Sequence, residues 1–127
     1  MTHQEDNEQI TLFKWAEFQS GKFPELKMLY HIPNGGKRSK AEAGRFKAMG
    51  VKSGVPDIHL PVPRGPYHSL YIELKAPKGK VSENQADWLA DLNRYGNKAV
   101  VCYGWEQAAL EIKNYLTQKE SKGLYDN

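Results

Sequence analysis

The sequence predicts an α/β domain in which a small mixed β-sheet is flanked by helices, and three observations lead to this prediction. Segments whose apolar residues recur at helical spacing alternate along the chain with short segments suited to strands. The predicted strands 57–62 and 69–75 are joined by a short stretch rich in proline and glycine, which favours antiparallel pairing. The strands 69–75 and 98–103 are separated by a predicted helix, as parallel neighbours require.

The size and composition are those of one soluble globular domain, with 127 residues of which 39% are hydrophobic and 26% charged. We expect this domain to span residues 1–119, followed by a polar, frayed tail at 120–127. No apolar run approaches the ~20 residues that span a membrane, and the polar N-terminus shows no signal peptide. The single Cys102 cannot form an internal disulfide, so a reducing, cytoplasmic location is expected.

The first helix is predicted from Thr2 to about Gly21. Thr2 and Glu5 have the spacing of a capping box, and glycine at position 21 ends helices readily. A broad apolar face is formed by Ile10, Leu12, Phe13, Trp15, Ala16 and Phe18. A strand at 27–32 follows, closed by a turn at 33–36 that contains proline, asparagine and two glycines.

A helix is predicted next at 39–49, with Ser39 as N-cap, Glu42 three residues later and Gly50 as the stop. The basic residues in and around it are Lys37, Arg38, Lys40, Arg45, Lys47 and Lys52. Against one acid they give a local charge of +5, above the +3 of the whole chain. We interpret this segment as a patch that contacts phosphates, and a solvated helix face is the alternative. Backbone N–H groups of Asn34, Gly35 and Gly36 are further candidates for phosphate contact, unless they form only a tight turn.

The C-terminal half continues the alternation of strands and helices. The strands at 57–62 and 69–75 are followed by a helix at 82–95 that has apolar residues at helical spacing. A buried strand is predicted at 98–103, and a last helix runs from 105 to about 118.

Three side chains around the central strands form the most informative pattern. Asp57 directly follows Pro56, and sixteen residues later Glu73 and Lys75 alternate with apolar residues on a predicted strand. Residues two apart on a strand share a face and lie roughly 6.6 Å apart, so both could serve one ion and one water. The spacing also allows two short strands and a turn, which would bring Asp57 to the same place.

This combination suits phosphodiester hydrolysis, which requires neutralisation of the phosphate charge, a deprotonated water and stabilisation of the leaving oxygen. A hard divalent cation supplies several of these functions, and carboxylates are its natural ligands. Asp57 and Glu73 would bind the metal, with the backbone carbonyl of Leu74 as a third ligand, and Lys75 would orient the water or offset developing charge. The alternative is a charge pair on a solvated face, with Asp57 as a turn residue.

The histidines add little to this pattern, because none of their spacings resembles a zinc site. His31, at a strand end, is a possible DNA contact. His59 shares a strand face with Asp57.

The motifs together resemble the VRR-NUC (virus-type replication-repair nuclease) family of the restriction-endonuclease-like PD-(D/E)xK superfamily. The resemblance lies in Ile32-Pro-Asn-Gly-Gly-Lys-Arg38, Gly50-Val-Lys-Ser-Gly-Val-Pro-Asp57, Tyr71-Ile-Glu-Leu-Lys75 and Val81-Ser-Glu-Asn-Gln85. It extends from about residue 5 to residue 116, in the order that the family uses. It implies a restriction-endonuclease-like core and a Mg2+- or Mn2+-dependent DNA endonuclease.

The resemblance also implies two further site residues. The family places an acid of the first helix near the metal, and the candidates here are Glu5 and Glu8. We favour Glu8 as the ligand, because it shares a stripe with Leu12 and Trp15, whereas Glu5 has the capping-box role. Gln85 matches a family glutamine of the catalytic site, although a reciprocal cap with the serine at position 82 is an equally good account.

Stand-alone members of this type are mostly phage proteins, which implies a homodimer that resolves four-way (Holliday) junctions in a bacterial or phage-infected cell. DNA, most of all branched DNA, is the expected partner. The alternatives are a monomeric, flap-type repair nuclease and a non-catalytic DNA-binding accessory protein. Retention of the two acids and the lysine together argues against the latter.

Overall fold

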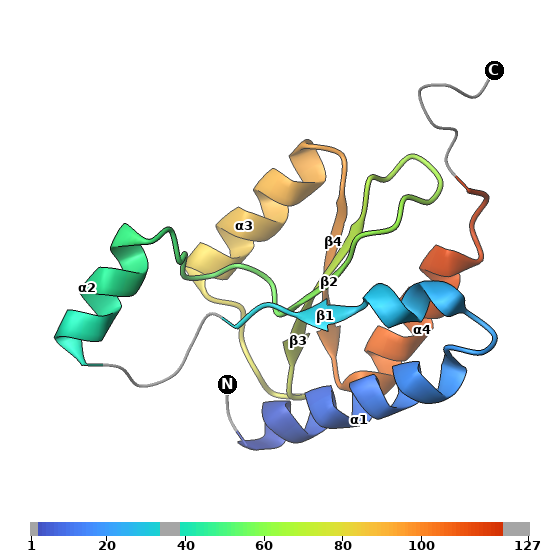
Figure 1. The fold of residues 1–127 in the computed structure, drawn as a ribbon, viewed down its shortest axis with the longest axis horizontal. Coiled ribbons are helices and arrows are strands. Elements are labelled where there is room, and N and C mark those ends of the chain that lie inside the picture. Colours follow the sequence, from blue (N-terminus) through green and yellow to red (C-terminus); the bar gives the residue numbers. More distant parts are fainter. Residues whose placement is uncertain (1–2, 34–38, 121–127) are drawn as a thin grey trace.

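A computed structural model describes residues 3–33 and 39–120 of the chain. A four-stranded sheet has α1 and α4 packed on one face, while α3 packs against β4 (Figure 1). The elements in order are α1 (His3–Gln19), the 3-10 helix η1 (Pro24–Met28), β1 (Tyr30–His31), α2 (Lys40–Ala48), β2 (Ile58–Leu60), β3 (Leu70–Lys75), α3 (Glu83–Arg94), β4 (Lys98–Tyr103) and α4 (Trp105–Leu116). Among these described residues, no helix is long and apolar enough to cross a membrane.

The sheet is mixed, in the order β1-β2-β3-β4, and the predicted strand directions are confirmed. β2 pairs antiparallel with β1 and with β3, because the proline-rich connection is short enough to return the chain directly. β3 and β4 are parallel and are joined through α3. The restriction-endonuclease-like α/β prediction therefore agrees with the observed architecture.

The core lies between this sheet and the pair α1 and α4. Alternation along β3 turns Leu70, Ile72 and Leu74 toward these helices, where all three are buried. The helices and β4 contribute Leu12, Ala16, Cys102, Ala108, Ala109, Ile112, Tyr115 and Leu116. The opposite face of β3 carries Glu73 and Lys75, so the fold separates an apolar side from a polar side of one strand.

The predicted strand 27–32 is wrong over its first half. Pro24 begins a 3-10 helix, in which its fixed φ and missing N–H are tolerated, and the strand is reduced to Tyr30–His31. The other predicted elements are present, and their ends differ from the prediction by at most two residues. Thr2, the turn at 34–36 and the tail after residue 120 lie outside the described residues, and Glu120 itself forms a β-bridge with Arg64.

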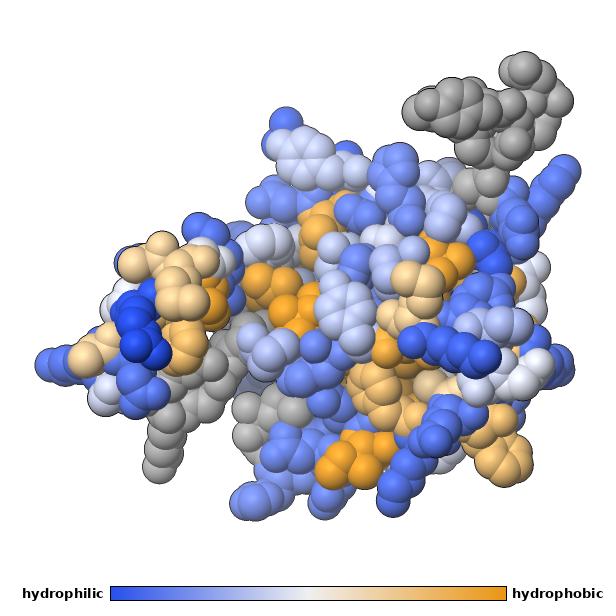
Figure 2. Space-filling view, in the orientation of Figure 1, coloured by the Kyte–Doolittle hydropathy of each residue, from blue (hydrophilic) through white to orange (hydrophobic). Residues whose placement is uncertain are grey.

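The helix α2 has the predicted cap, because the Ser39 hydroxyl oxygen accepts a hydrogen bond from the Glu42 N–H at 3.1 Å. None of its residues is buried. The ribbon places α2 apart from the sheet and the other helices, and the space-filling view shows it as a lobe with hydrophilic and hydrophobic side chains side by side (Figures 1 and 2). Its stability therefore depends on local capping more than on packing.

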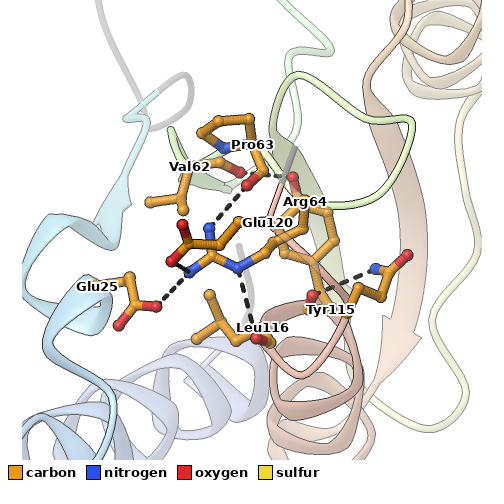
Figure 3. A network of polar contacts seen from close by, with 8 residues as sticks. Glu25, Val62, Pro63, Arg64, Tyr115, Leu116 and Glu120 are labelled. Carbon is orange, nitrogen blue, oxygen red and sulfur yellow. Dashed lines mark hydrogen bonds and ion pairs between the residues drawn. The ribbon is translucent and has the colours of Figure 1, made fainter. Parts of the chain in front are cut away.

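Arg64, in the connection between β2 and β3, is buried and links three parts of the fold (Figure 3). Its guanidinium forms an ion pair with Glu25 of η1, and its Nε donates to the Leu116 carbonyl at the end of α4 at 3.4 Å. Nearby, the Tyr115 hydroxyl donates to the Val62 carbonyl. The connection is therefore fastened to η1 and to the end of α4.

We expect Arg64→Ala to lower the free energy of unfolding by about 2–3 kcal/mol, because it leaves the Glu25 carboxylate and the Leu116 carbonyl without their donor. Urea denaturation would measure this loss. Lys14→Ala, at an exposed position of α1, is the control and is expected to change stability by less than about 0.5 kcal/mol. Equal stability of the two variants would contradict the structural role of Arg64.

Candidate active site

The strand β3 supplies two of the predicted site residues from its polar face. Glu73 is only 2% exposed, and Lys75 is also buried. The Lys75 Nζ lies 3.7 Å from Glu73 Oε2, as expected for residues two apart on one strand. A buried carboxylate and ammonium on a strand face are costly to desolvate, so the solvated charge pair considered as the alternative does not describe them.

Asp57 joins these residues through the register of the sheet. Ile58 of β2 pairs with Ile72 of β3. Because the two strands are antiparallel, Asp57, which directly precedes β2, comes opposite Glu73. Asp57 is buried, and its Oδ2 accepts a hydrogen bond from the Leu74 N–H at 3.0 Å. The backbone of β3 therefore holds the Asp57 carboxylate in position.

The segment before Asp57 is docked against α3. Gly54 has φ of 88°, and a Cβ atom there would lie 2.9 Å from Asn84, so only glycine fits. The Trp88 indole N–H donates to the Ser53 carbonyl at 3.1 Å. These contacts set the path of the chain as it enters β2, and with it the position of the Asp57 side chain.

The ionised form of Glu73 is disfavoured in this cluster. Its pKa is raised to about 9, mainly by burial and then by the nearby Asp57 carboxylate, while Lys75 opposes the shift. Glu5 adds a smaller contribution in the raising direction. One oxygen of the same group, Glu73 Oε1, is buried and has no hydrogen-bond partner among the described residues. An added cation would satisfy both features.

The structure gives the two acids of α1 different surroundings. Glu5 is buried and acts electrostatically on Glu73. Glu8 instead turns to α4, where its Oε2 accepts the Trp105 N–H at 2.6 Å. That helix begins after Gly104, which has no side chain to cap it, so Glu8 supplies the missing acceptor and a favourable negative charge. Of the two acids, Glu5 lies nearer to the Glu73 carboxylate in electrostatic terms, while Glu8 is engaged at the start of α4; which of them binds a metal stays a prediction.

Gln85 forms the predicted reciprocal cap and also contacts Glu73. Its Oε1 accepts from the Ser82 N–H, and the Ser82 hydroxyl accepts from the Gln85 N–H, which completes a capping box at the start of α3. Its Nε2 donates to Glu73 Oε2 at 3.3 Å. The cap fixes the side chain in the orientation that reaches the acidic cluster.

The donor set suits a hard, oxygen-seeking cation that keeps part of its water. Within the described ranges, no three His, Cys, Asp or Glu residues are gathered into a complete metal-binding group. Mg2+ is commonly held by one or two carboxylates together with waters and substrate phosphates, and Asp57 and Glu73 provide such a pair. Glu5 lies close enough to interact with Glu73 through charge. The Leu74 carbonyl remains a predicted ligand.

The predicted DNA-binding residues do not form one compact cluster as the acids and the lysine do. Lys40, Arg45, Lys47 and Lys52 are exposed, in and after α2. Asn34, Gly35, Gly36, Lys37 and Arg38 lie outside the described residues. Two cations missed in the sequence analysis, Lys78 and Lys80, are exposed in the connection between β3 and α3. This connection folds back on the site, because a Cβ at Gly79 would lie 3.3 Å from the Lys75 side chain.

The α/β core, with two acids and a lysine at adjacent strand ends, defines a nuclease domain of the restriction-endonuclease-like type. The model of the VRR-NUC domain matches residues 3–106, and the chain therefore belongs to the VRR-NUC family of virus-type replication-repair nucleases. A solved structure described as a VRR_NUC domain protein is similar, with a TM-score of 0.82 and 30% sequence identity over 97% of this chain and 96% of that chain. Comparison with curated proteins gives no match. A nuclease domain implies DNA as the substrate.

Proposed function

We propose that this domain is a Mg2+- or Mn2+-dependent endonuclease that cuts branched DNA, resolving four-way junctions as a homodimer. The observation that carries the catalytic part is the buried Asp57–Glu73 pair, in which one Glu73 oxygen has no hydrogen-bond partner in the described part of the chain while Lys75 lies beside the other oxygen. Such a pair is unfavourable by itself and becomes favourable when a cation joins it. The family assignment supports the choice of DNA as substrate.

The chemistry is divided among the residues of the site. A bound divalent cation would neutralise the scissile phosphate and make a coordinated water more acidic. Asp57, held by the Leu74 N–H, and Glu73, held by Gln85, would bind that cation with little rearrangement. The Lys75 ammonium orients the attacking water and offsets negative charge that develops in the transition state.

The experiment that tests this function is a cleavage panel with a labelled four-way junction, a flap and a plain duplex. We expect cleavage of the branched DNA with Mg2+ or Mn2+, and none with EDTA or in the Asp57→Asn variant. Cleavage that survives both treatments would refute the proposed mechanism. Cleavage of flaps alone by a monomer would favour the repair-type alternative, and binding without any cleavage would favour the accessory protein.

The homodimer is supported by the surface of α3. This helix is amphipathic, yet none of its residues is buried. Trp88, Leu92 and Tyr95 recur at helical spacing and line a shallow cavity of about 340 Å³, with Tyr95 68% exposed. A second copy of the chain that covered this face would complete its burial. Light scattering during gel filtration would test this, with twice the 14.5 kDa chain mass as the expected result.

The two acids of α1 are expected to differ in metal binding. Glu5→Gln should weaken Mg2+ binding in calorimetric titration, because it removes a charge that acts on Glu73. Glu8→Gln should leave that affinity within about twofold and instead lower stability by about 1 kcal/mol, because it weakens the cap of α4. The opposite order of Mg2+ affinities would favour Glu8 as the metal ligand.

The exposed cations of α2 are expected to contribute to DNA affinity. Neutralising Lys40 and Arg45 together should reduce the slope of log affinity against log salt by about 0.9 for each lost contact on duplex arms. A two-fold dimer would lose each contact twice, so the slope would change by nearly four units, against about two for a monomer. Neutralising Lys14 and Lys113, on α1 and α4, is the control. An unchanged slope in the α2 variant would mean that α2 is an ordinary solvated helix.

A further inference from the structure

Three aromatic rings lie side by side on the polar face of the sheet, next to the acidic residues. Tyr30 of β1 pairs with His59 of β2, and His59 pairs with Tyr71 of β3, so their side chains share one face. The His59 and Tyr71 rings are stacked, with centroids 4.0 Å apart and 12° between their planes. Tyr30 meets His59 edge to face at 5.4 Å. We call Tyr30, His59 and Tyr71 the aromatic row.

This row continues the face that carries the catalytic acids. His59 lies two residues after Asp57 on the chain, and Tyr71 lies two residues before Glu73. Two residues of an antiparallel strand span about 6.8 Å. That distance is twice the roughly 3.4 Å rise per nucleotide of one duplex strand. A nucleotide in the row would therefore lie one or two positions from a phosphate bound at the acids.

The row is held rigid by hydrogen bonds that engage the polar atoms of Tyr30 and His59. The Ser69 hydroxyl donates to Asn97 Oδ1 at 2.8 Å, so it accepts from His59 Nε2 at 3.0 Å. His59 Nδ1 is then the acceptor for the Tyr30 hydroxyl, at 2.8 Å. Tyr30 is nevertheless 46% exposed, at the edge of the sheet. What it offers to a ligand is the surface of an immobilised aromatic ring.

We propose that the aromatic row binds an unpaired nucleobase of the DNA strand that is cut, one or two nucleotides from the scissile phosphate, by stacking on Tyr30. This inference rests on the proposed nuclease function and narrows its substrate. The face of an aromatic ring recognises the π-face that every base possesses, so binding does not depend on base identity. Bases within a duplex are already stacked on their neighbours, whereas branch points and single-stranded arms expose base faces. The row thus favours branched DNA in which a nucleotide beside the cut is unpaired, either by opening at the branch point or in a single-stranded arm.

The test measures stacking without cleavage, in EDTA, with a flap DNA that carries 2-aminopurine in its single-stranded arm next to the branch. Wild-type protein is expected to quench the 2-aminopurine fluorescence. Tyr30→Ala should lose at least half of the quenching and about 10-fold in affinity, the scale of one stacked base. Phe18→Ala is the matched control, since Phe18 is an 87% exposed aromatic residue on α1. Tyr30→Trp keeps an aromatic ring at the edge strand and should retain the quenching.

The outcomes separate this inference from the nuclease function. Normal cleavage by wild-type protein with no quenching, or equal quenching in Tyr30→Ala and Phe18→Ala, would overturn the aromatic row as a base-binding site while leaving the nuclease intact. Quenching that depends on Tyr30 in a protein that cuts no DNA would overturn the nuclease function and leave the base-binding site standing. If Tyr30→Ala does not fold, loss of quenching in Tyr30→Trp would overturn the inference.

Discussion

Lys75→Ala is expected to cut DNA at least about 100-fold more slowly than the wild-type protein, because one preorganised charge that stabilises the transition state is lost. DNA affinity should stay within about threefold of wild type, since most of that affinity comes from phosphate contacts elsewhere. The Lys75 ammonium is buried at 3.7 Å from Glu73 Oε2, so its charge is fixed beside the acidic pair. Single-turnover cleavage of the preferred branched substrate, with binding measured in EDTA, separates the two quantities.

The matched control for this measurement is Lys113→Ala, which removes an exposed cation on α4. It should leave both rate and affinity unchanged. Loss of the Lys75 charge leaves the buried Glu73 without a compensating charge, so the folding of Lys75→Ala has to be checked. Circular dichroism would establish it. A cleavage rate within threefold of wild type in a folded variant would remove Lys75 from the mechanism.

The sequence was sufficient for those parts of the site that depend on strand geometry. Alternation along a strand places Glu73 and Lys75 on one face whatever the surrounding fold, and the short connection to Asp57 leaves little freedom in how the strands pair. The capping spacing of Ser82 and Gln85 was equally local, and it was confirmed. The additional contact from Gln85 to Glu73 depends on how α3 sits on the sheet.

The two acids of α1 could not be distinguished from the sequence. Glu5 and Glu8 are three residues apart, so they project from nearly the same side of α1, and helical periodicity alone cannot separate them. They differ by one turn along the helix axis. This difference places Glu5 close enough to Glu73 to act on it, and places Glu8 beside the start of α4, a contact with a residue 97 positions away. Only the packing of α1 against α4 distinguishes the two, and no local pattern reports it.

The raised pKa of Glu73 leads to the last prediction, which concerns pH and stability without divalent cations. Burial and the Asp57 carboxylate together raise this pKa from 4.5 to about 9, so between these values the folded chain holds a proton that the unfolded chain releases. The stability that protonated Glu73 allows the folded chain is fully present below pH 4.5 and is lost as the pH rises toward 9. We therefore expect unfolding free energy in EDTA to fall from pH 6 to 8 more steeply in wild type than in Glu73→Gln, by up to about 1.4 kcal/mol per pH unit.

The same protonation should couple metal binding to pH. Glu73 must lose its proton before it can serve as a carboxylate ligand, so Mg2+ affinity should rise across this interval and binding should release up to one proton. Calorimetric titrations at one pH in two buffers with different ionisation enthalpies would count that proton. Glu73→Gln should bind Mg2+ weakly and release no proton.

Equal pH slopes of stability in the two proteins, together with buffer-independent Mg2+ binding by wild type, would show that Glu73 is already ionised without the metal. The cation would then bind to a pair of charges already in place, and proton release would contribute nothing to its affinity.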